Sequence, residues 1–179
     1  MTAMTKVLIT GATGFLGSNV ARRCLQEGFE THVLLRKASN KWRINDVLSE
    51  LREHESDLSS YKVLVRILEE VKPNVILHLA ADGTLPTVQK DIDRIIATNF
   101  IGSVNLLRAA DNVNYSSFIN FGSSSEYGVK SVPMIESDVV EPMSVYGATK
   151  ASSTLFFQTW ARISGEPIIT VRPFSVYGY

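Results

Sequence analysis

A glycine-rich turn near the beginning of the chain is the feature that most narrows the folds it can adopt. Residues 10–17 read Thr-Gly-Ala-Thr-Gly-Phe-Leu-Gly and follow the apolar run 7–9. A strand that turns through glycines into an amphipathic helix presents backbone N–H groups to a pyrophosphate. Gly11 would permit the tight turn, Gly14 the close approach of the backbone, and Gly17 the helix–strand contact. Such turns also precede helices that bind nothing, but the place of this one after a first strand favours dinucleotide binding.

Apolar runs of strand length alternate with helical patterns along the chain. This alternation is typical of βαβ units and therefore of a parallel sheet. The predicted fold class is α/β, a doubly wound, Rossmann-like parallel sheet with helices on both faces, in one domain over residues 1–179. A serine cap is expected to start the second helix. Strands are predicted at 6–10, 31–35, 51–55, 74–79, 117–121 and 168–172, helices at 16–27, 59–71, 92–110 and 145–163, and an active-site loop at 128–143.

Tyr146 and Lys150 form the second informative pattern. They stand four residues apart, so that on a helix both side chains project from one face. An ammonium beside a phenol lowers the pKa of the phenol and lets it give or take a proton near neutral pH. A dinucleotide cradle followed by such a pair predicts hydride chemistry at a carbinol or carbonyl carbon.

Three serines follow the strand expected at 117–121, in the segment Ser-Ser-Ser-Glu-Tyr-Gly at 123–128. Ligands of doubly wound sheets lie outside the carboxyl ends of the strands, so these hydroxyls are expected to face the crevice. One of them can hydrogen-bond a substrate oxygen while Tyr146 moves its proton, although serines after a strand also commonly cap a turn. Glu126 is open to two interpretations, a catalytic acid or a plain loop carboxylate.

Two cations stand where NAD-binding sites usually carry an acid. Arg36 and Lys37 follow the strand expected at 31–35, at the position of the carboxylate that hydrogen-bonds the adenosine ribose. Arginine binds a phosphate group through a two-pronged fork and therefore suits a 2′-phosphate. We predict NADP as the cofactor, with NAD as the alternative. A solvated basic strand end is the competing explanation for these two cations.

The composition indicates a soluble enzyme domain that works in the cytoplasm. Lys plus Arg and Asp plus Glu are both 18 among 179 residues, so no attraction to nucleic acid or anionic lipid is indicated. Cys24 is the one cysteine, lies on an apolar helical stripe and is expected to be inert in a reducing compartment. No apolar run reaches the roughly 18 residues that span a bilayer, and no signal-peptide pattern precedes the first strand. No residue spacing predicts a metal site.

Several large or titratable side chains are expected to be structural. His78 lies inside an apolar strand and is interpreted as a buried, hydrogen-bonded histidine rather than a base. His32 and His54 show no partner pattern in the sequence. Trp42 and Trp160 are expected to pack.

These motifs resemble the extended short-chain dehydrogenase/reductase superfamily and, within it, the NAD(P)-dependent nucleotide-sugar epimerase/dehydratase family. The resemblance covers nearly the whole chain, with the motifs in the family's order. It rests on the turn at 10–17, Asp57-Leu58, the strand and turn at 76–81, the segment that begins Asn99-Phe100-Ile101-Gly102, the serine loop at 122–128, the Tyr146 and Lys150 pair, and Arg-Pro-Phe-Ser-Val-Tyr-Gly at 172–178.

The resemblance implies a role for each of these motifs. Tyr146 would be the acid/base on a sugar hydroxyl, and Lys150 would bind the nicotinamide ribose and tune the tyrosine. Counting back from Tyr127 places Ser123 at the family's catalytic serine or threonine, with Ser124 as the alternative. The residues implied to bind the cofactor are Gly11, Thr13, Gly14, Phe15, Leu16, Gly17, Arg36, Asp57, Leu58, Leu79, Ala80, Ala81, Asn99, Tyr146, Lys150, Pro173 and Ser175.

The implied partners are a nucleotide-sugar substrate and a second copy of the chain. In this family the helices corresponding to 92–110 and 145–163 pair across a dimer, and Phe156, Phe157 and Trp160 are expected to be partly involved. Two other functions stay open. One is a dinucleotide-binding regulatory module without turnover, and the other is an alcohol- or steroid-type reductase of the same superfamily.

The chain departs from the family pattern in three places. Glu126 directly precedes Tyr127, whereas dehydratases carry an acid two residues before that tyrosine, so epimerase or reductase chemistry is favoured over 4,6-dehydration. Ser175 stands where the family often has asparagine. Family members also continue well beyond this length into a small substrate lobe. We therefore expect a chain truncated before that lobe and inactive on a sugar by itself.

Overall fold

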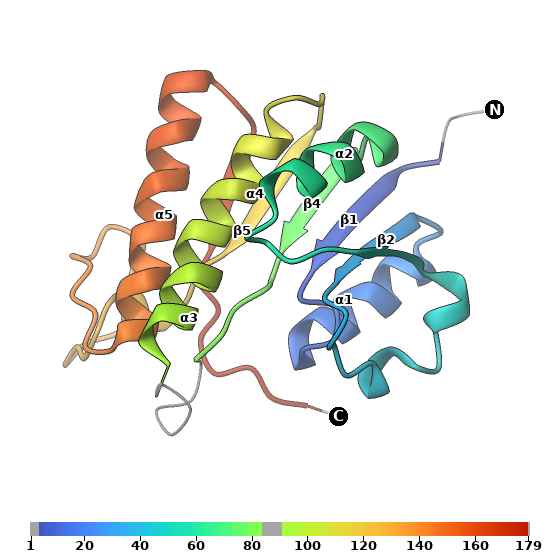
Figure 1. The fold of residues 1–179 in the computed structure, drawn as a ribbon. Helices are drawn as coiled ribbons and strands as arrows, with labels where there is room; N and C mark the ends of the chain where they lie inside the picture. Colours follow the sequence, from blue (N-terminus) through green and yellow to red (C-terminus); the bar gives the residue numbers. More distant parts are fainter. Residues whose placement is uncertain (1–3, 84–90, 179) are drawn as a thin grey trace.

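In residues 4–83 and 91–178, which the computed structural model describes, six strands form one parallel sheet in the order β3-β2-β1-β4-β5-β6 (Figure 1). This is the strand order of a doubly wound α/β sheet, so the predicted fold class is confirmed. The strands are β1 (Lys6–Thr10), β2 (Glu30–Leu35), β3 (Arg52–Glu55), β4 (Val75–His78), β5 (Ser117–Phe121) and β6 (Ile168–Val171). The helices are α1 (Phe15–Gln26), α2 (Tyr61–Val71), α3 (Ile92–Ile96), α4 (Gly102–Ala110) and α5 (Val145–Ser164), with short 3-10 turns η1 (Trp42–Ile44), η2 (Leu48–Glu50) and η5 (Ser124–Glu126).

Helices cover the two faces of the sheet unequally. On one face α2, α4 and α5 lie side by side (Figure 1), and Phe157 packs there against Phe118 in the larger core. On the other face α1 and the segment after β2 cover a second core that contains Ile9 and Cys24, and burial raises the pKa of the Cys24 thiol. The edge strand β6 leaves Ile169 exposed. Among the described helices, none combines the length and apolar character needed to cross a membrane.

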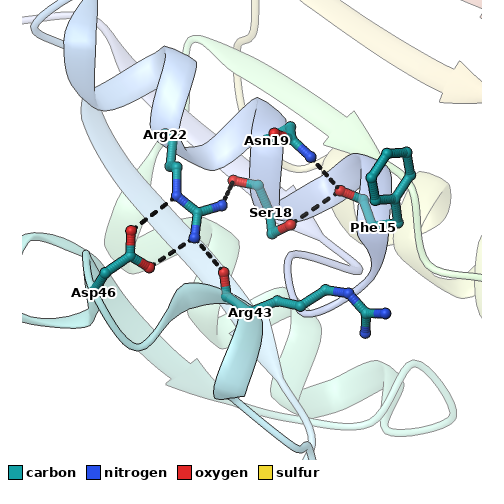
Figure 2. Close-up of polar contacts among 6 residues, drawn as sticks. All are labelled: Phe15, Ser18, Asn19, Arg22, Arg43 and Asp46. Atoms are coloured by element: carbon teal, nitrogen blue, oxygen red, sulfur yellow. Dashed lines mark hydrogen bonds and ion pairs between the residues drawn. The ribbon is translucent and has the colours of Figure 1, made fainter. Parts of the chain in front are cut away.

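Arg22 ties α1 to the segment that follows β2. Its guanidinium donates to both carboxylate oxygens of Asp46, at 2.7 and 3.0 Å, and to the carbonyl oxygens of Ser18 and Arg43 (Figure 2). This two-pronged geometry fixes the direction of approach as well as the distance. The hydroxyl of Ser18 also donates to the carbonyl of Phe15, so the first turn of α1 is held from inside the helix.

Of the two tryptophans that were expected to pack, only Trp160 does so. Trp160 packs as expected, stacked on Phe156 with ring centroids 6.1 Å apart. The expectation was wrong for Trp42, which is 64% exposed and has the Arg43 guanidinium 4.2 Å from its ring centroid. In the 3-10 turn η1 it is Ile44 that is buried against α1, and Trp42 is left in solvent.

Two polar side-chain arrangements differ from the sequence prediction. The side chain of Ser60 makes no capping hydrogen bond to α2, and the carboxylate of Asp57 instead accepts the Ser59 N–H at 2.9 Å. His32 and His54, for which the sequence showed no partner, hydrogen-bond each other at 2.9 Å. Parallel pairing of β2 with β3 places them on the same face of the sheet, which a pattern within one strand cannot show.

The helix predicted over 92–110 is continuous but not uniform. A π-helical turn, Ala97–Ile101, joins α3 to α4. The carbonyl oxygen of Asn99 in this turn accepts the hydroxyls of Ser103 and Ser153, each at 2.6 Å. Ser153 belongs to α5, so one carbonyl group links the two neighbouring helices. A π-helical turn of this kind has no distinct residue pattern of its own, so the sequence pattern predicted one uninterrupted helix here.

His78 is the buried, hydrogen-bonded histidine that the sequence predicted. Its Nδ1 lies 2.7 Å from the Thr10 hydroxyl and its Nε2 lies 2.7 Å from the Ser103 hydroxyl. The Ser103 hydroxyl gives its one proton to Asn99, so it accepts a hydrogen bond from Nε2–H of His78. The network therefore selects the neutral Nε2–H tautomer. Burial, helped by the charge of Lys150, lowers the pKa of His78 to about 3.

We expect the free energy of unfolding to fall as the pH decreases from 6.5 towards 3. Unfolded His78 takes up a proton near pH 6.5, whereas the folded one stays neutral to about pH 3. One such group lowers the free energy of unfolding by about 1.4 kcal/mol for each pH unit below 6.5. Urea unfolding at pH 7, 6 and 5 measures the slope, which should be shallower in His78→Gln and changed less in the half-buried control His54→Gln. Equal slopes in the wild type and His78→Gln would contradict this assignment.

Candidate active site

Two adjoining pockets form one groove along the carboxyl ends of the strands. They share Gly11, Gly14, Leu79 and Ala81. The chain winds outward from β1 to β3 and then returns to β4, so the groove lies at the switch point where doubly wound folds bind ligands. Every residue expected to bind the cofactor lines this groove except Asn99. The outer pocket adds Thr13, Arg36, Asp57, Leu58 and Ala80, and the inner pocket adds Phe15, Leu16, Gly17, Ser123, Ser124, Tyr146, Lys150, Pro173 and Ser175.

The glycine turn leaves space at the centre of the groove that any side chain would fill. Gly11 has φ +76°, and a Cβ there would lie 2.6 Å from the backbone nitrogen of Ala80. A Cβ on Gly17 would lie 2.2 Å from the carbonyl oxygen of Gly11, so Gly17 closes the turn rather than contacting the strand alone. Gly14 caps α1 without a side-chain acceptor. The first N–H groups of α1 are therefore directed to a ligand, which fits a pyrophosphate.

The outer pocket ends among basic side chains. Arg36 lines it, is exposed, and has its backbone N–H held by the Ser39 hydroxyl at 3.0 Å. Lys37 and Arg94 join Arg36 around an adjacent hollow. A backbone N–H lowers the pKa of the Asp57 carboxyl, which also borders this end. Three cations and two carboxylates, Glu55 and Asp57, thus border this end of the groove.

Helix α5 presents Tyr146 and Lys150 to the inner pocket, one turn apart. The helix begins at Val145 because the Ser144 hydroxyl caps it, accepting the Gly147 N–H at 3.0 Å. The phenol of Tyr146 hydrogen-bonds the side chain of Ser123, which comes from the turn after β5. The fold therefore brings the three groups together from two separate elements.

Burial dominates the titration of the tyrosine and the lysine. It raises the pKa of Tyr146, and the hydrogen bond with Ser123 offsets only part of that rise. The expected lowering of this pKa by Lys150 is therefore wrong for the structure, because taking the phenol out of water disfavours its charged form. Lys150 is 1% exposed, and burial lowers the pKa of its ammonium to about 8. Both groups carry their protons at pH 7.

Asn99 is the predicted cofactor residue that does not line the groove. Its side chain accepts the Asp82 N–H at 2.7 Å and donates to the Asp82 carbonyl at 2.9 Å and to the Thr149 hydroxyl at 3.1 Å. Thr98, its neighbour, is the residue of this helix that reaches the outer pocket. Asn99 therefore shapes the groove by fixing the backbone beyond β4 against α5.

Glu126 fits neither interpretation that the sequence left open. Its side chain is fully buried, it pairs with Arg172 at 2.6 Å, and its carboxylate accepts the Ser123 N–H at 2.8 Å. The Ser123 hydroxyl in turn accepts the Ser125 N–H, which completes a capping box around η5. Sequence reasoning named Glu126 but missed its capping role and its pairing with Arg172. The Ser-x-x-Glu spacing from Ser123 to Glu126 is the pattern of a capping box and was the available signal.

The described part of the chain contains no cluster of metal-ligating side chains. Within residues 4–83 and 91–178, no group of three or more His, Cys, Asp or Glu side chains is arranged to hold a metal ion. The polar groups of the groove are hydroxyls, one phenol, cations, backbone N–H groups and, in the outer pocket, the carboxylates of Asp57 and Asp82. This set of donors suits a phosphorylated organic ligand.

Comparison with known proteins identifies relatives over the whole length of the chain. The family model for the "NAD dependent epimerase/dehydratase family" matches residues 7–179. Protein CapI of Staphylococcus aureus and a probable UDP-glucuronate 4-epimerase of Rhizobium meliloti are each 31% identical over 97% of this chain. The match covers 54% of each of those proteins, so the chain spans about half the length of the curated relatives it matches.

Solved structures have the same fold. The UDP-glucose 4-epimerase of Thermotoga maritima, with UDP-glucose, matches 94% of this chain and 55% of its own at a TM-score of 0.85 and 26% identity. The UDP-glucuronic acid 4-epimerase of Bacillus cereus, in complex with UDP-glucuronic acid and NAD, matches 97% of this chain and 58% of its own. Its TM-score is 0.84 and its identity 27%.

Proposed function

The chain belongs to the NAD-dependent epimerase/dehydratase family, and from that premise we propose that it binds NAD(P) and exchanges a hydride with a carbon of a nucleotide sugar. One observation carries the proposal: the groove runs without a break from the glycine turn to Ser123, Tyr146 and Lys150. A dinucleotide laid on the turn has its reactive end beside a phenol and an ammonium. Two of the relatives described above, a probable UDP-glucuronate 4-epimerase and a UDP-glucose 4-epimerase with UDP-glucose, support the substrate class.

The positions of the inner-pocket residues support distinct roles. Bound nicotinamide supplies the hydride acceptor or donor for the sugar carbon. Tyr146 takes the proton of the hydroxyl on that carbon or returns it, and Ser123 hydrogen-bonds the same oxygen. Lys150 holds the nicotinamide ribose, and its ammonium stabilises the charge that develops on the phenol. Pro173 and Ser175 line the inner pocket, which supports a role for them beside the nicotinamide.

Epimerase or reductase chemistry is favoured over 4,6-dehydration. Eliminating water from a sugar needs a further acid and base at the substrate. Among the described residues that line the inner pocket there is no Asp or Glu. The nearby carboxylate, Glu126, is fully buried in its pair with Arg172. The Tyr146 and Lys150 pair also favours an enzyme over a regulatory module, which needs no acid/base, although it does not distinguish an alcohol- or steroid-type reductase.

We predict that NADPH binds more tightly than NADH, because Arg36 and Lys37 border the adenosine end of the groove. Loss of one charge-assisted phosphate contact costs roughly 1.5–3 kcal/mol, so Arg36→Ala should narrow the difference about tenfold or more. Calorimetric titration with both cofactors measures the difference. Arg52→Ala, an exposed arginine on β3, is the matched control and should leave it unchanged. Equal affinities in the unmutated protein would exclude a preference for NADP.

We predict that Tyr146→Phe, in a protein of the family's full length, removes turnover and leaves dinucleotide affinity nearly intact. The hydroxyl moves a proton in the transition state but does not hold the pyrophosphate, so kcat should fall by at least about 10²-fold. Lys150→Ala should weaken both turnover and binding, since its ammonium serves the phenol and the ribose. The chain by itself should bind dinucleotide weakly and turn over no sugar. A Tyr146→Phe enzyme that keeps more than about a tenth of wild-type kcat would refute the acid–base role.

We also propose a homodimer formed through the long helices. Ile101 in the π-helical turn before α4 is 47% exposed and Leu155 on α5 is 53% exposed, and Phe156 and Trp160 on α5 are half-buried. Phe157 is not available for this contact, contrary to expectation, because it is fully buried against the sheet. Sedimentation at tens of micromolar should show a dimer, and Leu155→Glu should shift it towards monomer. A monomer throughout that range would remove the proposal.

A further inference from the structure

Glu126 is a fully buried carboxylate bound by its own turn and by two other segments of the chain. Its Oε1 accepts the backbone N–H of Ser123 at 2.8 Å and the hydroxyl of Thr154 at 2.9 Å. Its Oε2 accepts Nε of Arg172 at 2.6 Å, and Nη1 of Arg172 donates to the Tyr127 hydroxyl at 2.9 Å. An ionised side chain is found at 0% exposure only where charge and lone pairs are satisfied in this way.

The three partners of the Glu126 carboxylate lie on the segments that carry or adjoin the proposed catalytic groups. Ser123 belongs to the turn after β5, and Thr154 lies one helical turn beyond Lys150 on α5. Arg172 directly follows β6 and precedes the segment that lines the inner pocket at Pro173. One carboxylate therefore sets the position of the serine relative to the helix of the tyrosine and lysine. Glycine at 122 makes room for it, since a Cβ there would lie 2.3 Å from Oε1 of Glu126.

Glu126 also provides the negative charge that faces Lys150. The ammonium of Lys150 is buried, Glu126 on η5 acts on it, and His78 on β4 responds to it, while Tyr146 lies one turn away on the same helix. His78 and Tyr146 are neutral at pH 7. Glu126 raises the pKa of Lys150 against the lowering caused by burial. Arg172 forms an ion pair with the same carboxylate, with Nε 2.6 Å from Oε2.

We propose that Glu126 is a positioning residue for the reaction proposed above: its carboxylate holds Ser123 against α5 and keeps the buried ammonium of Lys150 charged. This inference rests on the proposed function, in which Lys150 binds the nicotinamide ribose. It assigns two separable tasks to one side chain. The geometric task needs the oxygen atoms and the length of the glutamate, and the electrostatic task needs its charge.

Substitutions at Glu126 separate the two tasks. Glu126→Gln keeps an acceptor oxygen for Ser123 and Thr154 and removes the charge. Glu126→Asp keeps the charge and withdraws the carboxylate by one methylene. Because Gln leaves Arg172 buried without its counter-ion, the double variant Glu126→Gln/Arg172→Met removes both charges together. Glu141→Gln makes the same change in the exposed pair that Glu141 forms with Lys130 and is the matched control.

The test is the affinity for NADP(H), measured by calorimetry between pH 6 and 9.5, with thermal unfolding recorded at each pH. In the wild type, affinity should fall as Lys150 loses its proton, above about pH 8. Glu126→Gln and the double variant should move the midpoint of this fall down by about one pH unit. Glu126→Asp should weaken binding about tenfold without moving the midpoint. Glu141→Gln should match the wild type.

Each alternative result overturns the proposal in an identifiable way. An unmoved midpoint in both charge-removing variants would refute the electrostatic task, and unchanged affinity in Glu126→Asp would refute the geometric one. If all Glu126 variants unfold while Glu141→Gln stays folded, the role is limited to stability and the proposal is wrong. Lys150→Met tests the proposed function separately, because it should abolish the pH dependence. A wild-type profile in Lys150→Met would refute the role of Lys150 and, with it, the electrostatic task of Glu126.

Discussion

The carboxyl ends of β1 and β4 approach each other so closely that residue 11 has no room for a side chain. A Cβ at Gly11 would lie 2.6 Å from the backbone nitrogen of Ala80, and Gly11 adopts φ +76° to pass this point. The contact forces the chain to leave β1 through a turn that only glycine tolerates, and the turn fixes where α1 begins. This close approach of β1 and β4 sets the positions of the groove, the N-terminus of α1 and the backbone beyond β4.

A series of buried hydrogen bonds connects the carboxyl ends of β1 and β4 to the helices α4 and α5. Thr10 at the end of β1 bonds His78 on β4, His78 bonds Ser103 on α4, and Ser103 bonds the Asn99 carbonyl. The same carbonyl accepts Ser153 on α5, the helix of Tyr146. The hydroxyls of Thr10 and Ser103 fix one tautomer of His78, and the Ser153 hydroxyl lies within hydrogen-bond distance of the Thr149 carbonyl as well as the Asn99 carbonyl. A fully satisfied buried network of this kind specifies one packing of α4 and α5 on the sheet.

The sequence predicted most of the fold because apolar runs buried on both faces are unambiguous strands. The bounds of β1 and β5 came out as predicted, and the groove contains the predicted glycine, serine, tyrosine and lysine residues. The failures share a physical cause. The exposure of Trp42, the pairing of His32 with His54 and the π-turn at Asn99 depend on contacts between elements, which local periodicity does not contain. Glu126 is different, because the sequence contains the capping-box spacing, and only the burial of the Glu126 side chain could not be predicted from it.

The charges around the phenol explain how a tyrosine with a raised pKa can serve as an acid/base. In the resting site Tyr146 is neutral, because burial disfavours the phenolate more than the Ser123 hydrogen bond favours it. Lys150 carries a buried ammonium one turn from Tyr146 on the same helix, and Glu126 favours its charged form. In a site partly shielded from water, that ammonium acts with reduced screening on any negative charge that forms on the phenol during proton transfer. The same burial that keeps the proton on Tyr146 at rest therefore strengthens the stabilisation available in the transition state.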